Sequence, residues 1–90
     1  MLTVEVPLMN HAEFEDEVIQ IVAGITNKDA SVISRDTKLV GDLGMDSASA
    51  LVLLVELEDA FDVTLSDRAA ASMRTVGDIF DYLGVIVKLA

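Results

Sequence analysis

Apolar residues return at helical spacing in three stretches of the chain, and this pattern constrains the fold more than any other feature. Within each stretch they lie mostly three or four residues apart, which places them on one face of a helix. The pattern predicts helices over 11–25, 46–61 and 75–87. The residues expected in their core stripes are Phe14, Val18, Ile21, Val22, Ile25, Ala50, Leu53, Leu54, Leu57, Phe61, Val76, Ile79, Phe80, Leu83 and Val87.

Capping residues stand where each predicted helix begins. Asn10 with Glu13, and Thr75 with Asp78, have the spacing of a capping box, and Asp46 is a good N-cap for the second helix. Local chemistry and periodicity therefore predict the same three helix starts.

The segments between these helices differ in kind. Residues 26–45 form a long predicted loop that we expect to be held on the core by the aliphatic residues Val32, Ile33, Leu39 and Leu43. An alanine triplet favours a short helix over 67–73, with an irregular segment as the alternative. The sequence thus predicts an all-α four-helix bundle, with three longer helices, one short helix and a long first loop.

Ninety residues suffice for one modest core, and 52% of them are apolar. Residues 1–9 lack a helical period and are expected to be an extended or disordered leader, so the single domain covers 10–90. The chain has no cysteine, which excludes disulfides and thiolate chemistry. We expect a cytoplasmic protein, since a signal peptide pattern is missing and the longest apolar run, 50–55, is too short for a bilayer, and we expect it to be a monomer.

Enzyme chemistry finds little support in the residue pattern. The single histidine, His11, is far in sequence from any candidate nucleophile, and Ser47 lacks the glycines of a nucleophile elbow. A calcium loop starting at Asp42 would place Leu53 where its bidentate glutamate belongs. Gly41 and Gly44 do not form a phosphate-binding fingerprint. We expect a non-catalytic protein without a metal.

Sixteen acidic residues against six basic ones give a formal charge of −10. Such a charge repels nucleic acid and anionic membranes and favours partners with basic patches. Seven acids and no base lie between Lys38 and Arg68. This cluster is either an ordinary solvated surface or a feature that steers a basic partner.

The predicted second helix is apolar on two sides. Ala48, Leu51, Val52 and Val55 lie opposite its core stripe. Either the helix is sandwiched between others of the same domain, or these residues form an exposed patch that marks a docking site.

Ser47 lies at the junction of the long loop and this helix. A helix N-terminus favours an anionic group, so a hydroxyl here suits a phosphate ester. Taken alone, Asp46-Ser47 is more often an ordinary cap than an attachment site.

Four segments together resemble the acyl carrier and peptidyl carrier protein family: LGMDS at 43–47, VELEDAF at 55–61, TVGD at 75–78 and Tyr82-Leu83. The likeness runs from about residue 11 to residue 87. It implies that a phosphopantetheinyl transferase attaches 4′-phosphopantetheine from coenzyme A to Ser47, with Asp46 beside the arm. It also implies partner enzymes of the acyltransferase, ligase or ketosynthase type, with basic and apolar docking patches.

Two departures from the family pattern refine this expectation. Ala48, Ser49 and Val52 stand where relatives usually have leucine and then acids, and Ser66 stands where many have proline. We therefore expect a mixed docking face in which apolar contact and acidic steering combine. Its expected members are Met45, Ala48, Leu51, Val52, Val55, Glu56, Glu58, Asp59 and Asp62.

The same resemblance implies an acyl cargo held as a thioester. A shelter for it is expected between the last three helices, lined by Leu54, Leu57, Met73, Ile79 and Phe80, although methionine at 73 is also common as plain core. The departures favour polyketide or related specialised biosynthesis. An aminoacyl or peptidyl carrier, a carrier of housekeeping fatty acid synthesis and an unmodified interaction module remain alternatives.

Overall fold

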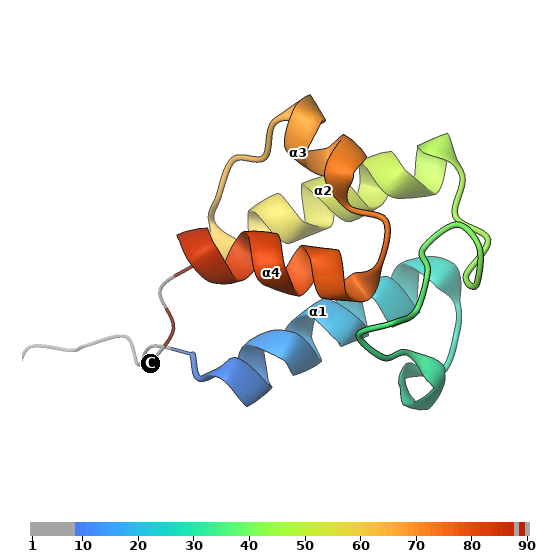
Figure 1. Ribbon diagram of the computed structural model, residues 1–90, viewed down its shortest axis with the longest axis horizontal. Helices are drawn as coiled ribbons and strands as arrows, with labels where there is room; N and C mark the ends of the chain where they lie inside the picture. Colours follow the sequence, from blue (N-terminus) through green and yellow to red (C-terminus); the bar gives the residue numbers. More distant parts are fainter. Residues whose placement is uncertain (1–8, 88, 90) are drawn as a thin grey trace, which may run out of the picture.

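The computed structural model describes residues 9–87 and Leu89, and these form the predicted all-α bundle (Figure 1). Helix α1 spans His11–Thr26, α2 spans Ser47–Phe61, α3 spans Asp67–Ser72 and α4 spans Val76–Ile86. A single 3-10 turn, Ala30–Val32, interrupts the long loop. Of the predicted leader, only Met9 lies within the described residues, where it forms an isolated bridge with Leu89.

The predicted caps are present. The Asn10 side chain accepts the Glu13 amide at 2.8 Å while Glu13 accepts the Asn10 amide at 3.1 Å, and Thr75 and Asp78 repeat this exchange on α4. Ser66 caps α3 through the Ala69 amide. These bonds satisfy backbone donors that a helix start leaves open, so each helix begins where the sequence predicts.

The core lies between α1, α2 and α4. The Phe14 ring lies 5.3 Å from the Phe61 ring and 6.3 Å from the Phe80 ring, between ring centres. Most of the predicted core stripe is buried, but Ala50 is exposed. The buried apolar residues of the helices are Phe14, Val18, Val22, Ala23, Leu53, Leu57, Ala69, Val76, Ile79, Phe80 and Leu83.

The long loop is held on this core as predicted, with one exception. Ile33, Leu39 and Leu43 are buried, whereas Val32 is 64% exposed. The prediction for Val32 is wrong because the 3-10 turn that contains it buries none of its residues. Three aliphatic anchors therefore hold the loop.

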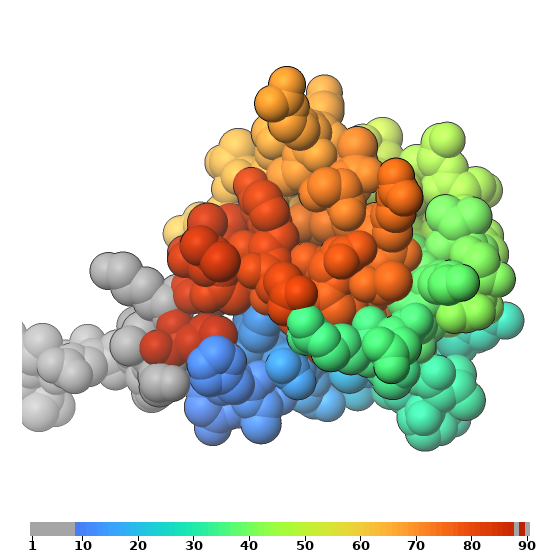
Figure 2. All heavy atoms as spheres, in the orientation of Figure 1, coloured from blue at the N-terminus to red at the C-terminus, as the bar shows by residue number. Residues whose placement is uncertain are grey.

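The loop also pairs with the start of α4. The amides of Val76 and Gly77 donate to the carbonyls of Thr37 and Arg35 at 3.0 and 2.8 Å. A Cβ atom on Gly77 would lie 2.7 Å from the Arg35 side chain, so only glycine permits this approach. Figure 2 shows the loop packed against the beginning of α4. The pairing fixes the segment that leads to α2.

Candidate functional site

A tight turn delivers the chain to the start of α2. The Asp42 carboxylate accepts the Lys38 amide at 2.8 Å, and the Gly44 amide donates to the Val40 carbonyl at 2.9 Å. Gly44 has a φ of +69°, which L side chains rarely adopt. The Met45 amide then donates to the Leu39 carbonyl at 3.1 Å. The site therefore stands on an ordered turn.

Ser47 is the first residue of α2 and is exposed. Asp46 before it is the N-cap, and its Oδ1 atom accepts both the amide and the hydroxyl of Ser49 at 2.8 Å. Within the described part of the chain, no hydrogen bond engages the Ser47 hydroxyl. The cap and the candidate attachment point are thus two different residues.

The hydrogen bonds to the Asp46 carboxylate favour its ionised form. The Ser49 amide, and after it the Ser49 hydroxyl, lower the pKa of the Asp46 carboxyl below its ordinary value. The carboxylate is therefore ionised at neutral pH and already has partners. Asp46 orders the first turn of α2 and does not engage the neighbouring Ser47 hydroxyl.

The outer face of α2 is open to solvent, so the sandwiched-helix alternative is wrong. Leu51 is 62% exposed, Val52 50% and Val55 49%, and Ala48 is exposed beside them. Glu56, Asp59 and Asp62 are exposed as well. We call Leu51, Val52 and Val55 the outer strip of α2.

Two residues predicted for the docking face have other positions. Met45 is only 6% exposed because its side chain turns into the molecule, so little of it is accessible to a partner. Glu58 is half-buried and accepts the Leu65 amide at 2.8 Å. Glu58 therefore braces the segment after α2, whereas the exposed acids are available to a partner.

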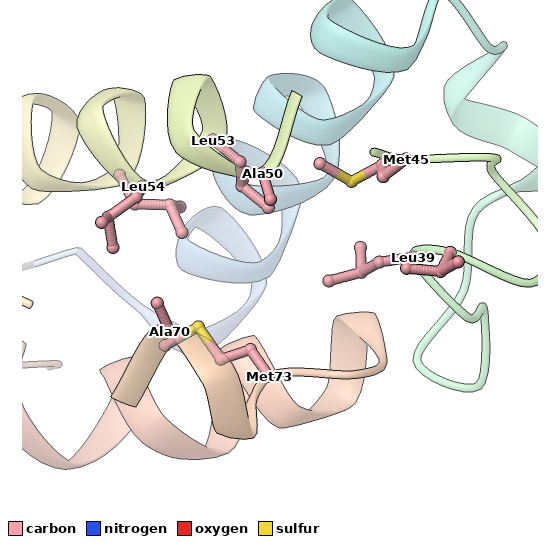
Figure 3. Close-up of a pocket in the computed structure, with 9 residues that line it drawn as sticks. Leu39, Met45, Ala50, Leu53, Leu54, Ala70 and Met73 are labelled. Carbon is pink, nitrogen blue, oxygen red and sulfur yellow. The ribbon is translucent and has the colours of Figure 1, made fainter. Parts of the chain in front are cut away.

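An apolar cavity of about 90 Å³ lies on the opposite side of α2 (Figure 3). Figure 3 shows Met45 at one end of it and Leu54 and Ala70 at the other. Its lining comes from α2, α3, the long loop before α2 and the residue after α3, and consists of Leu39, Val40, Met45, Ala50, Leu53, Leu54, Leu57, Ala70 and Met73. Every one of these side chains is apolar, so the cavity suits a hydrocarbon chain.

The sequence predicted this shelter only in part. Leu54, Leu57 and Met73 line the cavity as expected, but Ile79 and Phe80 do not. These two are buried in the closed core against α1, where Phe80 faces Phe14. The loop contributes the missing wall, and no periodicity in a loop signals which way its side chains point.

The described residues contain no group of histidine and carboxylate side chains that could hold a metal ion. His11 is exposed at the start of α1. None of the described helices has the length and apolar character needed to cross a bilayer.

Comparison with known families shows which family the chain belongs to. Residues 16–83 match the family described as "Phosphopantetheine attachment site". The protein belongs to this family of carrier proteins. Its members are non-catalytic and hold 4′-phosphopantetheine covalently.

Curated relatives agree. The acyl carrier protein of Syntrophobacter fumaroxidans is 41% identical over 75 residues, covering 83% of this chain and 93% of that protein. The acyl carrier protein of Porphyromonas gingivalis is 35% identical over 72 residues, covering 80% and 92%. The chain is therefore an acyl carrier protein of nearly the full length of these relatives.

Solved structures show the same fold. A putative acyl carrier protein from Mycobacterium tuberculosis superposes with a TM-score of 0.75 at 36% identity, covering 80% of this chain and 96% of that one. The HMG-ACPI domain of the CurA module from Lyngbya majuscula gives a TM-score of 0.76 at 23% identity, covering 97% and 87%. The second likeness concerns the fold alone.

The junction fits the cofactor that this family carries. A phosphate ester needs an accessible hydroxyl, and Ser47 offers one that is exposed and free of hydrogen bonds within the described residues. The first turn of α2 adds the partial positive charge of a helix N-terminus.

Proposed function

We propose that Ser47 is the residue to which 4′-phosphopantetheine is attached. The observation that supports this most strongly is that Ser47 is exposed at the start of α2 and that its hydroxyl has no hydrogen-bond partner in the described part of the chain. The carboxylate of the neighbouring cap, Asp46, is already occupied by Ser49. Asp46 holds the turn rigid, so a modifying enzyme meets the hydroxyl in one fixed position.

When bound, the cofactor supplies a thiol that holds an acyl group as a thioester. The chain contributes an ordered attachment point, a shelter and a docking surface. Met45 and Ala50 lie close in sequence to Ser47 and line the cavity, so a chain attached at the serine has its shelter on the same end of α2. A tethered cargo meets each enzyme at high effective concentration, so docking contacts can be weak.

The docking surface in this proposal is the outer strip of α2 with the exposed acids Glu56, Asp59 and Asp62. Three aliphatic side chains that are 49–62% exposed on one helix form an apolar patch of the kind that marks an interaction site. The acids around it favour approach by the basic patch of a partner enzyme, whether a transferase, an acyltransferase, a ligase or a ketosynthase.

We further propose that the cargo belongs to polyketide or related specialised biosynthesis, in the cytoplasm. Two observations support this. The first half of α2 is apolar where family members usually carry acids, which favours dedicated partners. The cavity of about 90 Å³ is smaller than the ~150 Å³ that accommodates benzene, which favours a short acyl chain over a long one.

Intact-mass analysis tests both levels of the proposal. Incubation of the purified protein with a broad-specificity phosphopantetheinyl transferase and coenzyme A should add the mass of one phosphopantetheinyl group. Protein isolated from its native cell should carry an acyl group that can be released from the arm and weighed. A released aminoacyl group would favour a peptide pathway, a long saturated chain would favour fatty acid synthesis, and failure to accept the arm would favour an unmodified interaction module.

A further inference from the structure

A second groove lies between α1 and α2, beyond the outer strip. Its lining comes from both helices and consists of Gln20, Ile21, Gly24, Ile25, Val52 and Glu56. Val52 and Glu56 also line the shallow hollow along the outer strip. The groove is therefore a continuation of the proposed docking surface onto α1, an element that the expected docking face does not include.

Gly24 lies within α1 although glycine is an unfavourable residue inside a helix. A glycine inside a helix costs about 1 kcal/mol relative to alanine, yet a Cβ atom at Gly24 would meet nothing within 4 Å. Packing within the described protein thus does not require glycine here. Its missing side chain leaves the floor of the groove open between the half-buried Ile21 and Ile25.

The charge around the groove limits what can enter it. Helices α1 and α2 together carry seven acidic residues and no lysine or arginine. Glu56 is exposed at the groove itself, and Glu17 is exposed one turn before Ile21. An apolar floor with an acidic rim is complementary to an aliphatic side chain that has a lysine or arginine beside it.

The distance to Ser47 selects among partners. At 1.5 Å per residue, Val52 lies about 7.5 Å along α2 from Ser47. A standard interface covers about 800 Å² on each partner, a patch of roughly 16 Å radius. The transferase must bring its active site to the Ser47 hydroxyl itself, whereas later partners act at the end of a flexible arm. The transferase is thus the partner whose contact area must lie closest to Ser47.

We infer that the α1–α2 groove is where the phosphopantetheinyl transferase docks an aliphatic side chain flanked by a basic one. This inference rests on the proposed attachment at Ser47. It assigns Gly24 a docking role and extends the docking surface from one helix to two.

A single introduced cysteine tests the groove, because the chain has none of its own. Gly24→Cys and Gly84→Cys are a matched pair, since both glycines are helical and a Cβ atom at either meets nothing within 4 Å. Gly84 lies on α4 and lines no part of the groove. Each folded variant is labelled with N-phenylmaleimide, freed of reagent and compared with its unlabelled form. The enzyme is the transferase purified from the native cell by its activity on the wild-type chain.

The label at position 24 should lower kcat/KM for arm transfer about tenfold, equivalent to ~1.4 kcal/mol of docking energy, mainly through KM. The label at position 84 should leave it unchanged. Equal transfer rates with and without the label at 24, or an equal loss at both positions, would overturn the inference. So would a wild-type dimer in sedimentation that the label at 24 dissociates, because the groove would then hold a second copy. Transfer of the arm to a Ser47→Ala variant at the wild-type rate would instead reject the attachment at Ser47.

Discussion

The two sides of α2 use similar side chains for different purposes. Leu53 and Leu57 on the inner side are 5% and 1% exposed and close the core, and the inner side also lines the cavity. Leu51 and Val55 on the outer side are 62% and 49% exposed. Burial fixes the free energy that an aliphatic side chain contributes to folding. The outer residues contribute little to stability, so their apolar character is available for binding.

Leu57→Ala should show how strongly the inner side of α2 contributes to the free energy of unfolding. Loss of a fully buried leucine typically costs 2–5 kcal/mol, about the stability margin of some small domains. Leu51→Ala, on the outer side of the same helix, should change the free energy of unfolding by less than about 0.5 kcal/mol. Urea denaturation of both variants measures the contrast. Equal losses would mean that the two sides are not distinct.

An acyl chain that occupies the cavity should raise the free energy of unfolding, and a substitution that blocks the cavity should reduce this gain. The lining of the cavity is wholly apolar, and each buried methylene contributes ~0.8 kcal/mol, so burial of about three methylenes of an acyl chain there would be favourable by about 2 kcal/mol. A hexanoyl group on the arm should therefore raise the free energy of unfolding by about 2 kcal/mol over the form with a free thiol. Ala50→Phe, at an exposed position that lines the cavity, should reduce this gain.

Chemical denaturation of both loaded forms measures the effect. Val85→Phe on α4 is the control, because Val85 is 84% exposed and does not line the cavity. An unchanged gain in Ala50→Phe would place the acyl chain elsewhere.

Val52→Asp and Val55→Asp should show the role of the outer side of α2 in partner docking. A charge in the apolar strip should reduce partner turnover about tenfold, a loss of ~1.4 kcal/mol of binding energy. Thermal stability should hardly change, since both valines are about half exposed. Val85→Asp on α4 is the matched control and should leave turnover unchanged. Turnover that survives both substitutions in the strip would show that partners dock elsewhere.

Helix starts and the inner stripe were predictable because their signals are local. Asn10, Asp46 and Thr75 are caps whose partners lie three residues away, and the spacing of Leu53 and Leu57 places both on one face. The Asp-Ser junction could be recognised for the same reason.

Features that depend on the packing of distant segments were not predictable in this way. Met45 turns inward because the loop pairs with the segment before α4, and Val40 joins the cavity wall for the same reason. Gly24 gave a weak signal, a glycine within an otherwise regular helix, but its neighbours across the groove appear only in three dimensions. Pairings between residues far apart in the sequence leave no period to detect.

The first turn of α2 lies on neither the inner nor the outer side of the helix. Its contribution to the stability of the protein should become measurable as the pH is lowered. The depressed pKa of Asp46 means that its stabilisation is complete above the unfolded pKa, near 4, and is lost as pH falls through the folded value. Asp46→Asn keeps a capping oxygen without the charge, so its stability deficit should shrink from neutral pH to about pH 2–3. Thermal melts across this range measure the difference. A deficit that grows in acid would contradict the assigned charge.

The most direct test of the account compares two serines in the same turn of α2. The Ser47 hydroxyl has no hydrogen-bond partner among the described residues, whereas the Ser49 hydroxyl donates to Asp46 at 2.8 Å. After incubation with transferase and coenzyme A, Ser47→Ala should keep its original mass, and Ser49→Ala should gain one phosphopantetheinyl group as the wild type does. Addition of the arm to Ser47→Ala would contradict the attachment site on which the account depends.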